Sequence, residues 1–442
     1  MNKFRLPALL SLTFALSTAG MLSAHAQSLT ELYTAARSYD ATYQSALSQS
    51  NATLARGEQA KASVWPVAAL QAGASRTNVD VAGAPATINY GSQNITLVAS
   101  QPLYRPANWA SYEQGDKQAA IAQAQLVAAE QDLIIRATQT YFDVLAAQDT
   151  LTFVQAQKAA VAEQLASAKR NFEVGTSTIT DTREAQARFD LTTAQEIAAE
   201  NDVRVKKIAL DQLVGKSNTQ PKALVVPVEL PQLAPNDVST WVARTEAGHP
   251  SIEQARLALE VAKLETAKAE AGHKPTLDLN ANYGANRNLG TSTSTATTRS
   301  NAGSVGLAFN LPLFAGFAVQ NRVKETLALE DKATSDLDNA KRSVAQATRA
   351  AFYGVQSGLS AVKAFEAAEA SSQSALDANK LGYQVGVRIN IDVLNSQSQL
   401  FQTKRDLAKA RYDVLVGGLK LRQANGTLKA EDLGPVNSLL AK

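Results

Sequence analysis

Four stretches of the chain alternate apolar and polar side chains at every second position. In the first stretch, Leu70 and Ala72 fall on one side and Gln71 on the other. A period of two is typical of a β-strand with one apolar and one polar face, and roughly ten residues suffice to cross a bilayer as a tilted strand. We therefore expect four strands of membrane-spanning length, at 67–79, 94–101, 276–284 and 304–311. The segments 80–93 and 290–303 are expected to be the loops within each pair.

Two further stretches, 105–174 and 318–385, have a helical composition over a length that globular helices do not reach. In the first, apolar residues recur at multiples of seven, as at Leu126, Leu133 and Val154. A helix of this length would extend about 105 Å, which favours a free-standing coiled-coil structure. A glycine turn follows each long stretch, and shorter helices are predicted after the turns, at 180–214 and 390–424.

The same order of elements recurs in both halves of the chain. Each strand pair follows a broken helix, with the break at Tyr39-Asp40 in one half and at His249-Pro250 in the other. The turn after each long helix carries an aromatic residue, then Val-Gly, then an aspartate, and the offsets 383 − 172, 386 − 175 and 392 − 181 all equal 211. We expect a tandem duplication, with repeat 1 at 27–214, a proline-rich connection at 215–236, repeat 2 at 237–424 and a tail at 425–442.

The first 26 residues are predicted to be a secretory signal peptide. Lys3 and Arg5 form a basic start, an apolar run follows, and Ala24-His25-Ala26 is a small-residue cleavage site. The whole chain has 43 Lys and Arg against 40 Asp and Glu, a near-neutral balance that argues against a nucleic-acid surface. It has no cysteine, which excludes disulfides, thiolate metal sites and a cysteine nucleophile. The histidines lack ligand spacing, so no metal site or cofactor is expected.

Four strands cannot close a barrel, because about eight are the usual minimum. An open sheet edge in lipid would leave backbone groups unpaired, so other copies of the chain are expected to complete the sheet. Three copies would give twelve strands, apolar outside and polar inside, around a lumen. Aromatic residues at the strand ends next to the helices fit an interfacial girdle, although packing at a helix–strand junction explains them equally well; they are Trp65, Tyr104, Trp109, Phe314 and Phe317.

Residues 28–433 resemble the TolC family of outer-membrane efflux proteins. The resemblance rests on the ordered motifs Thr140-Tyr141-Phe142-Asp143, Phe172-Glu173-Val174-Gly175, Thr180-Asp181, Lys274-Pro275-Thr276-Leu277, Leu311-Pro312-Leu313-Phe314, Gly382-Tyr383-Gln384-Val385-Gly386 and Asp392-Val393-Leu394. It implies an α+β membrane protein, a homotrimer whose 12-stranded β-barrel in the outer membrane, surrounded by lipid, continues into a long periplasmic α-helical barrel. It also implies a passive, non-enzymatic duct that meets a periplasmic adaptor protein and an inner-membrane transporter of RND, ABC or MFS type.

The resemblance places a gate at the two glycine turns. It implies that Arg388 contacts Thr180 and Asp181, and that Tyr383 contacts Asp181. Asp392 and Asn395 would lie at the tunnel entrance, where Asn395 replaces a family aspartate and would weaken a cation-attracting ring. The adaptor is expected to dock on the turns themselves, at Val174, Gly175, Thr176, Val385, Gly386 and Val387. The alternative for these charges is an ordinary solvated helix end, where an acid favours the helix dipole.

Two alternatives remain at the level of function. A periplasmic or surface coiled-coil scaffold or adaptor without a pore would explain the long helices, but not four alternating strands at duplicated positions. Within the duct interpretation, drug efflux and type I protein secretion are not separable from the residues, because no motif names a cargo.

Overall fold

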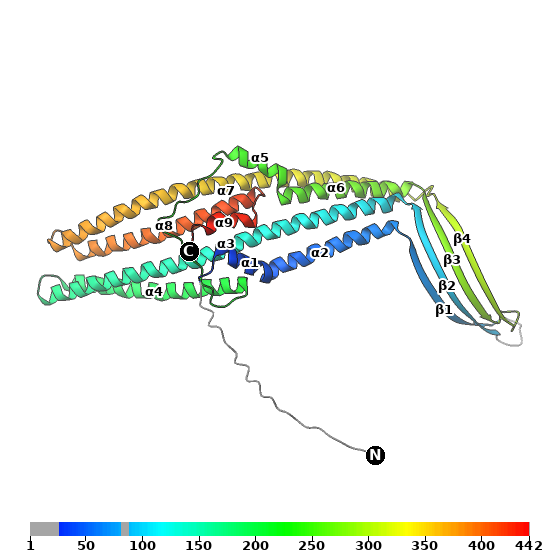
Figure 1. Ribbon diagram of the computed structural model, residues 1–442, viewed down its shortest axis with the longest axis horizontal. Helices are drawn as coiled ribbons and strands as arrows, with labels where there is room; N and C mark the ends of the chain where they lie inside the picture. The colour runs from blue at the N-terminus through cyan, green and yellow to red at the C-terminus, as the bar shows by residue number, and fades with distance from the viewer. Residues whose placement is uncertain (1–25, 81–87, 442) are drawn as a thin grey trace, which may run out of the picture.

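The computed structural model describes residues 26–80 and 88–441. The predicted signal peptide therefore lies outside the described residues, except for Ala26. The molecule is elongated, with long helices side by side along one axis and a four-stranded sheet bent away at one end (Figure 1). The helices are α1 Leu29–Tyr39, α2 Ala41–Lys61, α3 Pro106–Glu173, α4 Ile179–Val214, α5 Val238–Gly248, α6 Pro250–Glu270, α7 Ala318–Gln384, α8 Asn390–Ala424 and α9 Leu433–Asn437.

The sheet is antiparallel throughout, in the order β1-β2-β3-β4. Its strands are β1 Val67–Val79, β2 Ile88–Tyr104, β3 Thr276–Leu289 and β4 Thr297–Asn310. The first strand has the expected bounds. The expected strands 94–101, 276–284 and 304–311 were too short at the end far from the helices, where glycine, asparagine and serine suggested loops. Pairing overrides that weak propensity, since Val79 is opposite Ile88 and Leu289 is opposite Thr297. The strand expected at 94–101 also continues past Pro102 to Tyr104 at the helix end.

The two faces of the sheet differ in polarity. Residues directly opposite one another across antiparallel strands project to the same side, and the register aligns Leu70 with Leu97 and Leu97 with Tyr283. The other face aligns Gln71 with Thr96. The apolar side is exposed, including Leu70, Ile95, Leu97, Tyr283, Val305, Leu307 and Phe309. Burial of these side chains therefore requires something other than this chain.

The helices form one layer that continues the sheet. Next to the strands the helix order is α2, α3, α6, α7, which is the order of the strands they adjoin, and α3 packs on both α2 and α6. In the other half, α4 lies on α3, α8 lies between α3 and α7, and each long helix forms a hairpin with the shorter one that follows it (Figure 1). The element order is thus duplicated, as expected. In the described part of the chain, no helix is both long enough and apolar enough to cross a membrane.

The largest apolar core lies at mid-length of the helices, where α1 and α9 pack on α3 and α8. Tyr141 and Phe142 of α3 are fully buried there, and Phe142 stacks on Tyr412 of α8 with ring centroids 5.3 Å apart. The segment expected to be a tail belongs to this core, because Leu433 is buried and Leu440 forms a bridge to Leu224. The helical elements after residue 425 were not expected, since the segment is too short to show a period.

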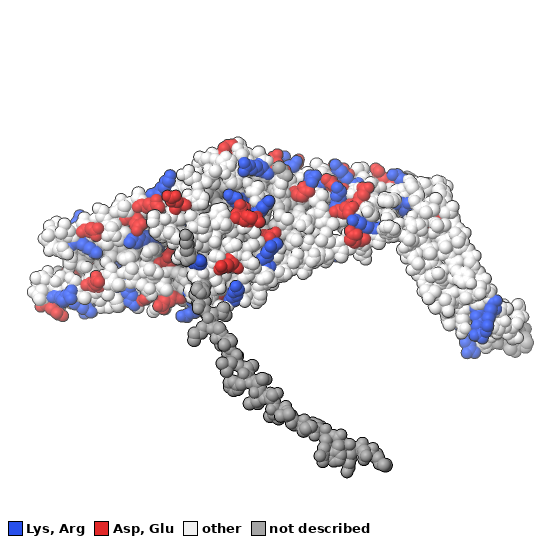
Figure 2. Space-filling model, in the orientation of Figure 1, with Lys and Arg blue, Asp and Glu red and all other residues white. Residues whose placement is uncertain are grey.

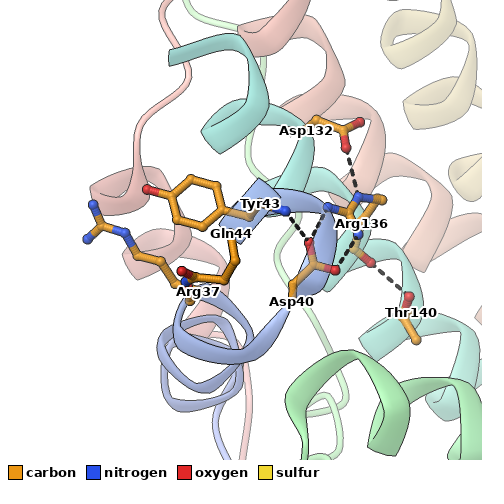
Figure 3. A network of polar contacts seen from close by, with 7 residues as sticks. All are labelled: Arg37, Asp40, Tyr43, Gln44, Asp132, Arg136 and Thr140. Carbon is orange, nitrogen blue, oxygen red and sulfur yellow. Dashed lines mark hydrogen bonds and ion pairs between the residues drawn. The ribbon is translucent and has the colours of Figure 1, made fainter. Parts of the chain in front are cut away.

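The break between α1 and α2 is held by Asp40, which caps the N-terminus of α2 and joins it to α3 (Figure 3). The Asp40 carboxylate accepts a hydrogen bond from the Tyr43 backbone at 2.9 Å, and it accepts two from the Arg136 guanidinium at 2.7 and 3.1 Å. Arg136 also donates to Asp132 at 2.7 Å. The bidentate hydrogen bonds from Arg136, followed by those from the backbone, hold the pKa of Asp40 below its usual range.

Replacing Asp40 with asparagine should destabilise the protein in a pH-dependent way. Because the folded-state pKa is lowered, the stabilisation is present above the ordinary aspartate pKa of about 4 and is lost as the pH falls through the folded-state value. We expect a loss of about 2 kcal/mol at neutral pH, shrinking below about pH 4. Urea unfolding of the purified protein across pH measures it. Asp132→Asn, at a half-exposed partner of Arg136, is the control, and a pH-independent difference for Asp40→Asn would contradict the assignment.

Candidate functional site at the hairpin turns

The turn between α3 and α4 ends the helix with a left-handed glycine. Gly175 has φ +79°, its N–H donates to the carbonyl of Phe172 at 3.0 Å, and the N–H of Thr176 donates to Asn171 at 2.8 Å. This pair of bonds is the Schellman motif, which requires a positive φ at the glycine. The motif leaves Val174 at the apex of the hairpin, with its side chain turned to solvent.

The turn between α7 and α8 repeats this geometry. Gly386 has φ +75°, its N–H donates to Tyr383 at 3.1 Å, and the N–H of Val387 donates to Gly382 at 2.8 Å. The two hairpin ends lie at the same end of the molecule, far from the sheet (Figure 1). The duplicated glycine motif therefore places two similar turns next to each other.

Both turns expose apolar side chains. The exposed fractions are 72% for Val174, 65% for Val385 and 78% for Val387. Ile179 and Ile389, which the sequence analysis did not single out, are exposed beside them. We name Val174, Ile179, Val385, Val387 and Ile389 the apolar tip. Exposed apolar residues gathered at a turn have no packing role within the chain, which is typical of a contact surface.

The Asp181 carboxylate accepts its hydrogen bonds from residues at the N-terminus of its own helix, α4. It accepts hydrogen bonds from the Thr178 backbone at 3.0 Å, the Thr178 hydroxyl at 2.8 Å and the Ser177 hydroxyl at 3.1 Å, which with the Thr178 cap forms a capping box. Burial opposes ionisation, but the hydrogen bonds from Thr178 and Ser177 together outweigh it and lower the pKa of Asp181. Asp181 is therefore a rigid, fixed anion at the tip, and Thr180 precedes it in the first turn of α4.

Arg388 lies against the second turn. Its stem packs on Gly382, where a Cβ would come within 2.6 Å of the Arg388 Cγ. Its guanidinium is 3.8 Å from Asp392, one turn along α8. The side chain is more than half exposed, so the pair with Asp392 is weak. Gly382 thus leaves the space that the Arg388 stem occupies, and Asp392 is the guanidinium's one ion-pair partner among the described residues.

The expected contacts of Arg388 with Thr180 and Asp181, and of Tyr383 with Asp181, are absent within the described chain. Asp181 is instead held by its cap, and the Tyr383 hydroxyl accepts a hydrogen bond from Asn171 at 3.3 Å. A single protomer does not test these contacts, because the helices that meet at the entrance can belong to different copies of the chain. Such bonds between copies stay a prediction.

Asn390 joins the two hairpins, and the sequence analysis missed it. It is fully buried, accepts a hydrogen bond from the Gln164 side chain and donates one to the Asp181 carbonyl at 3.3 Å. Its position in the first repeat is Ile179, since 390 − 179 is again 211, and Ile179 is exposed. The change from isoleucine in repeat 1 to asparagine in repeat 2 was the sequence signal that could have identified it.

The two residues expected at the tunnel entrance have different environments. The Asp392 carboxylate is partly exposed and faces Arg388. The Asn395 side-chain oxygen accepts a hydrogen bond from Arg188 of α4 at 2.9 Å, so its amide is held against the first hairpin. Among the described residues, no group of His, Asp or Glu has the arrangement of a metal site.

Comparison with known proteins adds three findings. The family model described as "Outer membrane efflux protein" matches residues 32–216 and 241–427, one segment in each repeat. Outer membrane protein TolC of Vibrio cholerae is 33% identical over 93% of this chain and 94% of its own length, and alkaline protease secretion protein AprF of Pseudomonas aeruginosa is 30% identical over 78% and 72%. The crystal structure of outer membrane protein VceC from Vibrio cholerae has the same fold, with a TM-score of 0.77 at 20% identity over 90% of this chain and 96% of that one.

Proposed function

Because this chain belongs to the outer membrane efflux protein family, we propose that three copies assemble into one tunnel from the periplasm to the cell exterior. The protein is an exit duct of the outer membrane. In this proposal the duct is passive and has no enzymatic activity. Cargo is handed to it by a periplasmic adaptor and an inner-membrane transporter, whose class, RND, ABC or MFS, determines whether small molecules or secreted proteins leave.

The open sheet is the observation that supports a trimer. β1 and β4 each have one edge without a partner in the described chain, and the apolar face is exposed along all four strands. The unpaired edges are not stable in lipid unless they are joined to other strands, whereas the apolar face is suited to contact with lipid. Pairing β4 of one copy with β1 of the next closes twelve strands around the polar face, which becomes the lumen.

The helices support the same assembly. Only seven of the 67 residues of α7 are buried, against twenty of the 68 in α3, so α7 lacks a neighbour on one side. Exposed apolar residues recur on α4, at Leu191, Ile197, Val205 and Ile208, and on α7, at Leu327, Leu329 and Tyr353. Packing α7 of one copy near α4 of the next would cover both sets and close a helical barrel below the sheet.

In the assembled tunnel, the hairpin turns form the periplasmic entrance. Arg388 of one copy binds Asp181 and Thr180 of its neighbour, while Asp392 and Asn395 line the opening. The bond between Arg388 and a carboxylate fixed by its cap is specific in geometry, yet breakable because water reaches it. The apolar tip docks the adaptor, and docking opens the entrance by separating the hairpins.

Engineered disulfides should lock the proposed trimer, and the chain has no native cysteine to interfere. Ala69→Cys on the polar face of β1 is combined in turn with Ala302→Cys, Ser304→Cys, Gly306→Cys or Ala308→Cys on the same face of β4. Only the pair whose Cβ atoms lie about 4 Å apart in the assembled barrel should bond. We expect one pair to give a covalent ladder ending at the trimer in a non-reducing gel.

The single-cysteine variants are the controls and should give no species larger than a dimer. A complete scan in which every pair stays monomeric would contradict the closure of β1 on β4. A ladder that continues beyond three copies would contradict the trimer.

A further inference from the structure

The described strands carry very few charges. Only four charged side chains occur in β1 to β4, and Asp278 at the helix end is paired with Arg105 at 2.6 Å. The other three are Arg76, Arg287 and Arg299. Figure 2 shows a sheet that is almost free of charge except for basic side chains at the end far from the helices. Apart from the paired Asp278, the charge on the sheet is therefore entirely positive and confined to the end far from the helices.

All three arginines project from the apolar face. Arg287 of β3 lies directly opposite Arg299 of β4, and both share the side of Tyr283, two rows nearer the helices. Ala74 of β1 pairs with Gln93 of β2, which pairs with Arg287 of β3, so all three project from the same face. Arg76 lies two residues beyond Ala74 and is therefore on this face too. In the proposed barrel this face points to the membrane, so the arginines do not line the lumen.

The arginines begin where the apolar band ends. On β3 the apolar side runs from Leu277 to Ala285, a length of about 27 Å at roughly 3.4 Å per residue, which matches the height of about 25 Å typical of a barrel's apolar band. Arg287 is the next residue on that face. The helices occupy the periplasmic side, so this boundary is the outer leaflet.

The arrangement is unfavourable unless an anion binds. Like charges directly opposite on neighbouring strands repel, yet Arg287 and Arg299 are such a pair. All three side chains are exposed, and none takes part in an ion pair between described residues. A ligand with several phosphates would remove the repulsion, because each guanidinium forms bidentate hydrogen bonds to a phosphate.

We propose that Arg76, Arg287 and Arg299 bind the phosphate groups of the anionic glycolipid, lipopolysaccharide, that forms the outer leaflet. The acyl chains of the same lipid lie along the apolar band, beside Tyr283 and Val305. The inference deepens the proposed function: joining β4 to β1 of the next copy brings Arg299 toward that copy's Arg76. The three arginines of each protomer then become a ring around the barrel that fixes its height in the membrane.

The test measures lipopolysaccharide binding to the purified full-length protein in detergent. The variant carries Arg76→Gln, Arg287→Gln and Arg299→Gln together. We expect it to bind at least tenfold more weakly than the wild type, whereas the corresponding Arg→Lys variant, which keeps the charge but not the bidentate donors, should have an intermediate affinity. The matched control carries Arg56→Gln, Arg204→Gln and Arg244→Gln and should bind as the wild type does. These three helical arginines are exposed and form no ion pair with another described residue.

Two competitor arms identify the ligand. Lipopolysaccharide stripped of its phosphates should bind the wild type at least tenfold more weakly, and millimolar inorganic phosphate should not displace the intact lipid. Binding that the three Arg→Gln changes do not reduce would overturn the inference, whether or not trimers form. Equal competition by free phosphate would overturn it in favour of a simple anion site. Trimer formation and conductance, measured on the same variant, test the proposed function separately.

Discussion

Replacing Val385 and Val387 together with aspartate should abolish export in cells while leaving the conductance of the purified channel within about twofold of the wild type. Both side chains are exposed at the apex of the second hairpin, so the change breaks no packing within the chain. An anchor residue buried in a partner contributes about 2 kcal/mol. Losing two such anchors weakens docking of the adaptor by about a thousandfold.

A matched control separates docking from a general effect of added charge. Val225→Asp with Val226→Asp places two acids on exposed apolar positions of the connection between the repeats, away from the tips, and should export normally. Pull-down of the periplasmic adaptor by each variant shows whether binding itself is lost. Normal export by the Val385 and Val387 variant would show that the apolar tip is not the docking surface.

Replacing Arg388 with serine should raise the conductance of the reconstituted channel at least severalfold. If each copy closes the entrance through one exposed Arg–carboxylate bond of up to about 1 kcal/mol, three bonds stabilise the closed state by up to about 3 kcal/mol. Losing them shifts the balance toward the open state by as much as about a hundredfold. The closed turn itself should persist, because the Schellman bonds at Gly386 involve only the backbone.

Two comparisons decide whether Arg388 acts through Asp181. Arg183→Ser removes another exposed positive charge near the tip and should leave conductance unchanged. Asp181→Asn combined with Arg388→Ser should conduct no more than either single variant, since both remove the same bond. Unchanged conductance of the Arg388→Ser variant would show that Arg388 is only a surface charge. Additive effects of the two substitutions on conductance would show that Arg388 binds a partner other than Asp181.

The architecture was predictable from the sequence because its signals are long and repeated. The period of two fixed β1 at its observed bounds, and the glycine motif at a constant offset located both turns. The strand ends were not predictable, because glycine, asparagine and serine interrupt the strand signal in 88–93 and 297–303, and these segments are ordered by their partners across the sheet. The burial of Leu433 in the mid-length core likewise depends on contacts far along the chain.

The site was predicted less completely than the fold. The turns, their glycines and the exposed valines followed from the motif, whereas Asn390 and Gly382 did not, since each matters through a neighbour that the pattern does not reveal. The partners of Arg388 and Asp181 depend on how copies meet. A single chain satisfies Asp181 with its own cap, so only the assembled tunnel tests that part of the prediction.

The most direct test of the duct is the current through a planar lipid bilayer after addition of the purified protein. A tunnel closed by three copies predicts discrete, uniform conductance steps from a species that migrates, unheated, at about three times the 46.9 kDa of one chain. Absence of steps from protein that inserts into the bilayer, or a species that stays monomeric, would contradict the account.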